Sequence, residues 1–191
     1  MTTAKKTAQA SFTAGEKVVY PAHGVGQITA IEDQEVAGFK LQVFVVYFDQ
    51  GKLTLRVPLA KAASAGMRKL SDSATVQQAF ETLGGRPLPK RGIWNRRATE
   101  YQEKISSGRL AAVAEVVRDL YRSPDQEEAS YSERQIYESA IEFLVKEVAA
   151  VKGMTETETL KAIEQELAKV PRVVSAIKSA KTADESKPDA A

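Results

Sequence analysis

Residues 39–58 read FKLQVFVVYFDQGKLTLRVP, and this stretch predicts two strands joined by a hairpin turn at residues 49–52. In residues 39–48 apolar side chains occupy both alternating faces, as in the central strand of a sheet. One face carries Leu41, Val43, Val45 and Tyr47, and the other carries Phe44, Val46 and Phe48.

The second strand of this hairpin, residues 53–57, alternates cleanly between apolar and polar side chains. Its pattern directs Leu53, Leu55 and Val57 toward a core, turns Thr54 and Arg56 outward, and ends at Pro58. Residues 16–20 and 25–32 indicate two earlier strands, and residues 67–70 a last one after a helical turn over 59–65. Five short strands in about sixty residues predict an SH3-like barrel.

Past Leu70 the apolar spacing becomes helical. The stripes are Val76, Ala79, Phe80 and Leu83; then Ala98, Tyr101 and Ile105; then Leu110, Val113, Val117, Leu120 and Tyr121. Capping boxes start two further helices. In the first helix Ser132 and Gln135 form the capping box, Tyr131 and Ile136 have the spacing of a hydrophobic staple, and Gly153 is the stop. In the second, Thr155 and Glu158 form the box, and Leu160, Ile163 and Leu167 continue the helix up to Pro171.

These patterns predict an α+β chain with a small β-barrel followed by a compact all-helical domain. We expect the barrel over residues 12–70 and the helical domain over 71–170. Residues 1–11 are expected to be a disordered tail. Residues 171–191 are expected to be mostly disordered, because residues 181–191 cannot bury enough apolar surface to order themselves.

Composition narrows the function. The net charge of +2 is too small for the whole molecule to bind a polyanion, so any contact with nucleic acid must come from local clustering of charge. The chain has no cysteine, no apolar leader and no run of about 18 apolar residues, so a cytoplasmic protein with no membrane contact is expected.

The sequence offers little for catalysis or cofactor binding. His23 is the only histidine and lies in a turn, where hydrogen bonding within its own loop is favoured over a catalytic role. Asp33, Glu35 and Asp49 lack the spacing of metal ligands, and no phosphate-binding glycine motif precedes a helix. We therefore expect a protein that is not an enzyme and that has no metal or cofactor.

The single tryptophan, Trp94, lies in a basic segment that also contains helix breakers. Its cationic neighbours are Arg86, Lys90, Arg91, Arg96 and Arg97. A flat aromatic side chain with cationic residues on both sides is suited to inserting beside a base step of nucleic acid, with the cations binding phosphates. The alternative is a tryptophan that packs where the segment meets the helical domain, with its indole N–H at the surface.

Two features of the barrel have their own alternatives. Tyr20, Phe44, Tyr47 and Phe48 could form an aromatic cage for a modified or extended peptide, although core packing is favoured for most of them. Arg56 suits a protein-binding anchor or a solvated surface charge. A peptide-binding adaptor module without DNA contact is therefore the alternative function.

Four motifs in order resemble the CarD/CdnL family of bacterial RNA polymerase-binding transcription regulators. They are GEKVVYPAHG at residues 15–24, LTLRVP at 53–58, WNRR at 94–97 and LAAVAEVVRDL at 110–120. The first two also resemble the polymerase-interacting module of transcription-repair coupling factors. The resemblance implies a Tudor-like N-terminal domain that binds the polymerase β subunit, and a helical domain that contacts promoter DNA at the upstream edge of the bubble.

On this resemblance Arg56 matches the family's polymerase-contacting arginine, and Thr54 and Gln34 are further candidate polymerase contacts. Trp94 matches a tryptophan that wedges into the minor groove and stabilises the open promoter complex. Arg96, Arg97, Lys90 and Arg91 would bind the DNA. A monomer that associates with the nucleoid through polymerase is implied. Where some members have a second polymerase-binding arginine, this chain has Asp33-Gln34-Glu35.

Overall fold

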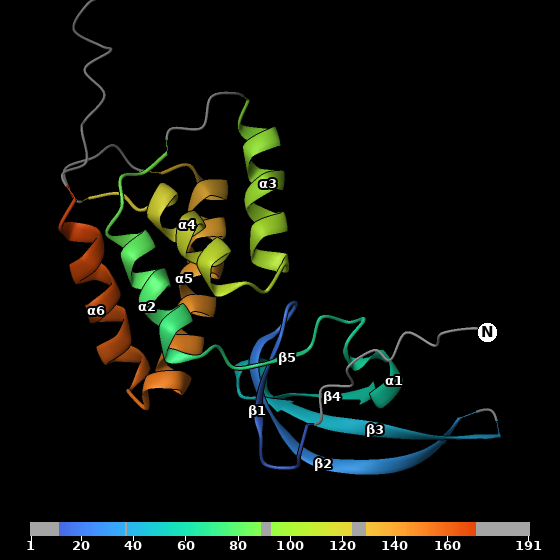
Figure 1. The fold of residues 1–191 in the computed structure, drawn as a ribbon. Helices are drawn as coiled ribbons and strands as arrows, with labels where there is room; N and C mark the ends of the chain where they lie inside the picture. Colours follow the sequence, from blue (N-terminus) through green and yellow to red (C-terminus); the bar gives the residue numbers. More distant parts are fainter. Residues whose placement is uncertain (1–11, 37, 89–92, 124–128, 171–191) are drawn as a thin grey trace, which may run out of the picture.

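The computed structural model describes residues 12–36, 38–88, 93–123 and 129–170. The fold is α+β, as predicted: an antiparallel sheet is followed by helices that pack together on one side of it (Figure 1). The tails expected at residues 1–11 and 171–191 lie outside the described residues.

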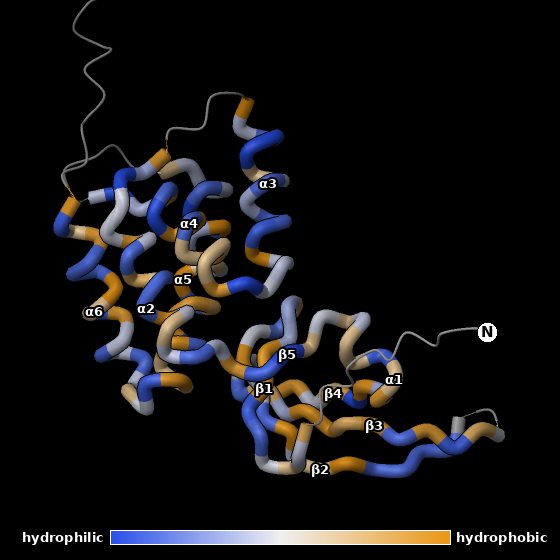
Figure 2. The backbone as a smooth tube through the Cα atoms, in the orientation of Figure 1, coloured by the Kyte–Doolittle hydropathy of each residue, from blue (hydrophilic) through white to orange (hydrophobic). Residues whose placement is uncertain are grey.

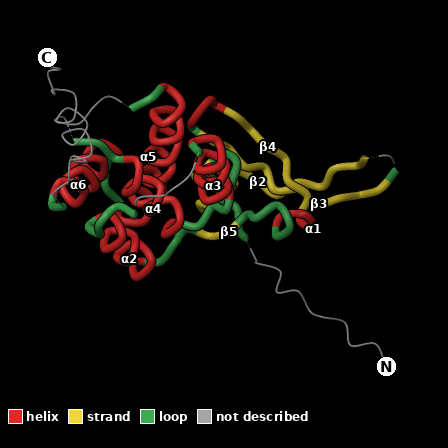
Figure 3. Tube along the Cα trace, turned by 90° about the horizontal axis from the view of Figure 1, so that it is seen from above, coloured by secondary structure: helices red, strands yellow, loops and turns green. Residues whose placement is uncertain are grey.

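Five strands form one antiparallel sheet in the order β4-β3-β2-β1-β5, which confirms the expected number of strands. They are β1 (Lys17–Tyr20), β2 (Gly24–Val36), β3 (Phe39–Phe48), β4 (Leu53–Pro58) and β5 (Arg68–Lys69), with a 3-10 turn η1 (Gln50–Lys52) and a short helix α1 (Leu59–Ala62). β2 continues beyond its expected end at residue 32. As a result, β2 and β3 form a long hairpin that extends away from the helices (Figures 1 and 3).

The sheet has its own apolar core. It contains Phe12, Val18, Ile28, Phe44, Val46, Phe48, Val57, Ala62 and Met67. Residues 43–46 and 48 of β3 are buried, with Tyr47 partly buried, as its two-faced pattern predicts. The same expectation is wrong for Leu41, which is exposed where the hairpin leaves the rest of the molecule, and for Leu53 at the start of β4.

Five helices make up the rest of the described chain, and we call them the helical half. They are α2 (Ser73–Leu83), α3 (Trp94–Ser106), α4 (Leu110–Leu120), α5 (Tyr131–Lys152) and α6 (Glu156–Ala168). Their apolar side chains form a second core, and Figure 2 marks the hydrophobic residues along these helices in orange. β1 belongs to both cores, because Val18 faces the sheet core while its neighbour Val19 packs with the helices.

The expected signals at the ends of α5 and α6 are confirmed in part. Thr155 and Glu158 form the expected capping box of α6, and Gly153 ends α5 in the left-handed conformation at φ 66°. The box expected for α5 is wrong. Ser130 and Glu133 cap that helix instead, so Tyr131 is its exposed first residue and not half of a staple.

A buried ion pair joins the sheet to the helical half. Glu147 of α5 is fully buried, and its carboxylate accepts hydrogen bonds from Arg68 Nη1 at 2.6 Å and Nη2 at 2.8 Å. Ser71 donates to the same carboxylate through its backbone N at 3.1 Å and its Oγ at 2.7 Å. Arg68 Nε also donates to the carbonyl of Gly108 at 2.9 Å, in the α3–α4 turn. This cluster fixes how the two halves sit against each other.

Candidate functional site

Trp94 is the first residue of α3, at the end of the helical half that lies away from the sheet (Figure 1). Its indole is partly buried and packs against the helical core, with its ring centre 6.5 Å from that of Tyr101. Trp94, Ala98, Tyr101 and Ile105 follow at i, i+4, i+7 and i+11, so the tryptophan does share a helical stripe with apolar residues. The sequence reasoning missed this spacing, because it treated Trp94 as part of the segment before the helix.

Tyr101 anchors this stripe. Its side chain is buried, and burial raises the pKa of the phenol, with a further rise from the negative charge of Asp119. Trp94 itself is partly buried and packs against the core. It is therefore neither fully buried nor fully exposed.

Two arginines converge on Glu133, and one of them also lies over the indole. The guanidinium carbon of Arg97 lies 5.2 Å from the centre of the Trp94 ring, within the range of a cation–π contact. Arg97 Nη2 is 3.8 Å from Glu133 Oε1, and Arg122 Nη2 is 3.2 Å from Glu133 Oε2. The start of α3, the chain after α4 and the start of α5 therefore meet at one carboxylate.

Among the described residues, the N-cap of α3 makes no side-chain capping hydrogen bond. Its N-cap residue, Ile93, has no polar side chain and is 79% exposed, and no acidic residue lies in the first turn. By contrast, α5 and α6 both begin with capping boxes. Arg96 is exposed in the same turn, whereas the predicted DNA contacts Lys90 and Arg91 lie outside the described residues. We call Ile93, Trp94, Arg96, Arg97, Arg122 and Glu133 the Trp94 end.

The predicted polymerase contacts share one face of the sheet. Arg56 is opposite Val45, and Gln34 is opposite Leu41, so the pairing turns both polar side chains to the same face. Arg56 is exposed and pairs with Glu32, with Nε and Oε2 3.7 Å apart. Thr54, two residues before Arg56, is exposed on that face as well.

Two apolar residues on this face were not among the predicted contacts. Phe39 is 73% exposed, and Leu41 is exposed beside it along β3. The sequence pattern did carry a signal, since these residues alternate with the polar Lys40 and Gln42, unlike the continuously apolar end of β3. We call Glu32, Gln34, Phe39, Leu41, Thr54 and Arg56 the Arg56 face.

The aromatic cage is not present. Phe44 and Phe48 are buried in the sheet core, and Tyr47 lies on the opposite face of β3. Tyr20 stacks on His23, with ring centres 5.6 Å apart. His23 therefore contacts rings, Tyr20 and also Phe48, and within the described residues no cluster of three or more acidic or histidine side chains could hold a metal ion.

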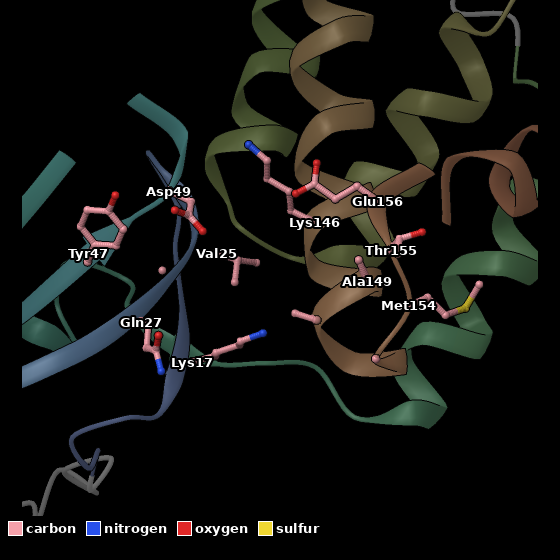
Figure 4. A pocket seen from close by; sticks show the side chains of 13 residues that line it. Lys17, Val25, Gln27, Tyr47, Asp49, Lys146, Ala149, Met154, Thr155 and Glu156 are labelled. Atoms are coloured by element: carbon pink, nitrogen blue, oxygen red, sulfur yellow. The ribbon is translucent and has the colours of Figure 1, made fainter. Parts of the chain in front are cut away.

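A groove of about 520 Å³ runs between the sheet and the α5–α6 corner (Figure 4). Its walls carry Lys17 and Lys146 but also Asp49 and Glu156, together with apolar Val25. Charges of both signs give no preference for an anion or a cation. The groove therefore contributes less to a functional interpretation than the Trp94 end and the Arg56 face.

Comparison with known proteins finds matches along most of the chain. Residues 12–71 match a family model described as "CarD-like/TRCF RID domain", and residues 78–164 match one described as "CarD, C-terminal domain". A curated relative from Bacillus subtilis (strain 168) is named "Putative transcription factor YdeB". It is 32% identical over 145 residues, which cover 76% of this chain and 95% of that protein. In the described ranges, no helix has the length and apolar character needed to span a membrane.

Proposed function

This chain belongs to the CarD/CdnL family of transcription regulators, and we propose that it acts at promoters by linking RNA polymerase to DNA without catalysing a reaction. In this proposal residues 12–70 bind the polymerase β subunit and residues 71–170 contact promoter DNA at the upstream edge of the bubble. The protein works as a monomer on polymerase, in the cytoplasm and at the nucleoid.

The Arg56 face supports the polymerase half of the proposal. Arg56 shares its face of the sheet with the exposed Phe39 and Leu41, and an exposed arginine is the kind of anchor that contributes strongly to protein interfaces. Glu32 holds the Arg56 guanidinium at the surface without burying it. Arg56 would pair with an acidic group on the β subunit, with Thr54 and Gln34 as neighbouring polar contacts and Phe39 and Leu41 as apolar ones.

The partly buried indole of Trp94 on an anchored helix is the observation that carries the DNA half. A side chain that inserts beside a base step needs some solvent access and a rigid base; Trp94 is only partly buried, and α3 is anchored through Tyr101. The uncapped start of α3 and the exposed Arg96 offer amides and a cation to nearby phosphates. Lys90, Arg91 and Arg97 would add backbone contacts.

Such contacts can favour the open promoter complex only if they are better with melted DNA than with paired DNA. Stacking of one base on an aromatic side chain contributes about 1–3 kcal/mol, and about 1.4 kcal/mol is a factor of ten. Because part of the indole remains packed on the core, we expect an effect of about tenfold on the lifetime of the open complex.

The test compares Trp94→Ala and Trp94→Leu in a promoter-complex dissociation assay. The leucine variant keeps apolar packing on the helical core but removes the aromatic plate, so it separates stacking from folding. We expect both variants to bind polymerase normally and to shorten the open-complex lifetime about tenfold. Lifetimes at the wild-type value for both variants would refute the wedge.

A further inference from the structure

The carboxylate of Glu133 has more partners than a helix cap requires. Glu133 is the third residue of α5, and its Oε2 accepts hydrogen bonds from Ser130 N at 3.1 Å and Ser130 Oγ at 3.2 Å, which completes the capping box. The same oxygen receives Arg122 Nη2 at 3.2 Å, while Oε1 faces Arg97 Nη2. The side chain is only 15% exposed, so these partners largely replace water around it.

This arrangement connects α5 to the indole. Glu133 holds Arg97, and the Arg97 guanidinium lies over the ring of Trp94. Without the negative charge, Arg97 and Arg122 would face each other as two cations, and Arg97 would gain free energy by turning toward water. The carboxylate therefore keeps a planar cation on one side of the indole.

We propose that Glu133 is a positioning residue for Trp94: through Arg97 it fixes the orientation in which the indole is presented at the end of α3. This inference rests on the proposed function of Trp94 in contacting DNA. It adds a role for α5, whose residues are 37 positions or more beyond the tryptophan in the sequence.

Glutamine at position 133 separates this role from capping. A capping box accepts Glu or Gln at its third position, so Glu133→Gln keeps the cap and removes the charge. Glu158 provides a matched control, because it occupies the same position in the capping box of α6, where its carboxylate accepts hydrogen bonds from Thr155. Glu158→Gln makes the same chemical change away from Trp94.

A second variant tests the link from the other side. Arg97→Lys keeps the positive charge for Glu133 and for a phosphate, but lysine lacks the planar group that stacks on the indole. It leaves the capping box of α5 intact. Glu133→Gln and Arg97→Lys should therefore change the environment of Trp94 in the same direction.

Trp94 is the only tryptophan in the chain, so its fluorescence reports this site alone. We expect Glu133→Gln and Arg97→Lys to increase acrylamide quenching and to shift the emission to longer wavelength, with Glu158→Gln at the wild-type values. In the promoter-complex dissociation assay both should shorten the lifetime about two- to fivefold, the factor that corresponds to an exposed cation–π contact.

Quenching of Glu133→Gln equal to that of Glu158→Gln would overturn the proposal. So would increased quenching with an unchanged lifetime, in a series where Trp94→Ala shortens the lifetime. If Trp94→Ala itself has no effect on the lifetime, the proposed function fails and the promoter role of Glu133 fails with it. The quenching result then decides separately whether Glu133 orients the indole.

Discussion

Replacing Glu147 by glutamine should destabilise the whole protein, because the change removes the charge at the centre of the cluster that joins its halves. The carboxylate is fully buried and accepts four hydrogen bonds from Arg68 and Ser71. Breaking a buried ion pair from one side costs about 3–5 kcal/mol. The Arg68 side chain is 29% exposed, so water can partly solvate the remaining charge. We therefore expect the free energy of unfolding to fall by about 3 kcal/mol.

Urea unfolding followed by circular dichroism measures this loss, and a thermal scan should show a fall in Tm of about 6–12 °C, at about 2–4 °C per kcal/mol for a chain of this size. Glu166→Gln is the control. It breaks the pair with Lys169, whose side chain is largely exposed, and such pairs contribute about 0–1 kcal/mol. A loss for Glu147→Gln as small as that of the control would refute the structural role of the cluster.

Three further predictions concern the sheet, the helix caps and the Arg56 face. Gly26→Ala should lower the free energy of unfolding in urea by about 1–3 kcal/mol, because a Cβ there would lie 2.7 Å from Phe48 Cε1. Gly84→Ala is the control and should be nearly neutral, because the nearest contacts of its Cβ are at 3.7 Å. Equal effects of the two variants would contradict the packing argument. Hydrogen bonds from Thr155 and Thr75 hold the pKa values of Glu158 and Asp72 below 4.5 and 3.8, so their contribution to stability is present above these values and is lost as the pH falls through the lower folded values. The urea midpoint of the wild-type protein should decline as the pH falls through that acid range. The decline should be less steep in the variant with both Asp72→Asn and Glu158→Gln, and an identical slope in the two proteins would contradict a role for these two carboxylates. Arg56→Glu should abolish binding to immobilised β subunit at unchanged Tm while Arg96→Glu retains it, and retention by both would exclude Arg56 as the anchor.

The sequence predicted most of the fold because its elements carry strong local patterns. The continuous apolar run of residues 43–48 and helical stripes such as Val76, Ala79 and Leu83 match the buried positions. The helix stop at Gly153 and the capping box of Thr155 were correct for the same reason, since each depends on a few neighbouring residues.

Where the prediction was wrong, the deciding contacts are not local. The α5 region contains two overlapping capping patterns, Ser130 with Glu133 and Ser132 with Gln135, and spacing alone does not rank them. In the structure Glu133 is held by Arg97 and Arg122 from other segments, which favours the earlier cap. The exposure of Leu41 was missed for a similar reason, because the alternating pattern of one strand does not reveal whether another element covers that face of the sheet.

The candidate DNA-binding residues show the limit of counting charges along the chain. Arg96 and Arg97 are adjacent and were assigned the same role, yet Arg96 is exposed while Arg97 is paired with Glu133 and stacked on Trp94. A phosphate that binds Arg97 must compete with this carboxylate, whereas one that binds Arg96 meets no such cost in the described structure. We therefore propose Arg96 as the first contact for the DNA backbone and propose that Arg97 contributes mainly by holding the indole. If this division is right, Arg96→Ala should reduce the salt dependence of promoter binding more than Arg97→Ala does.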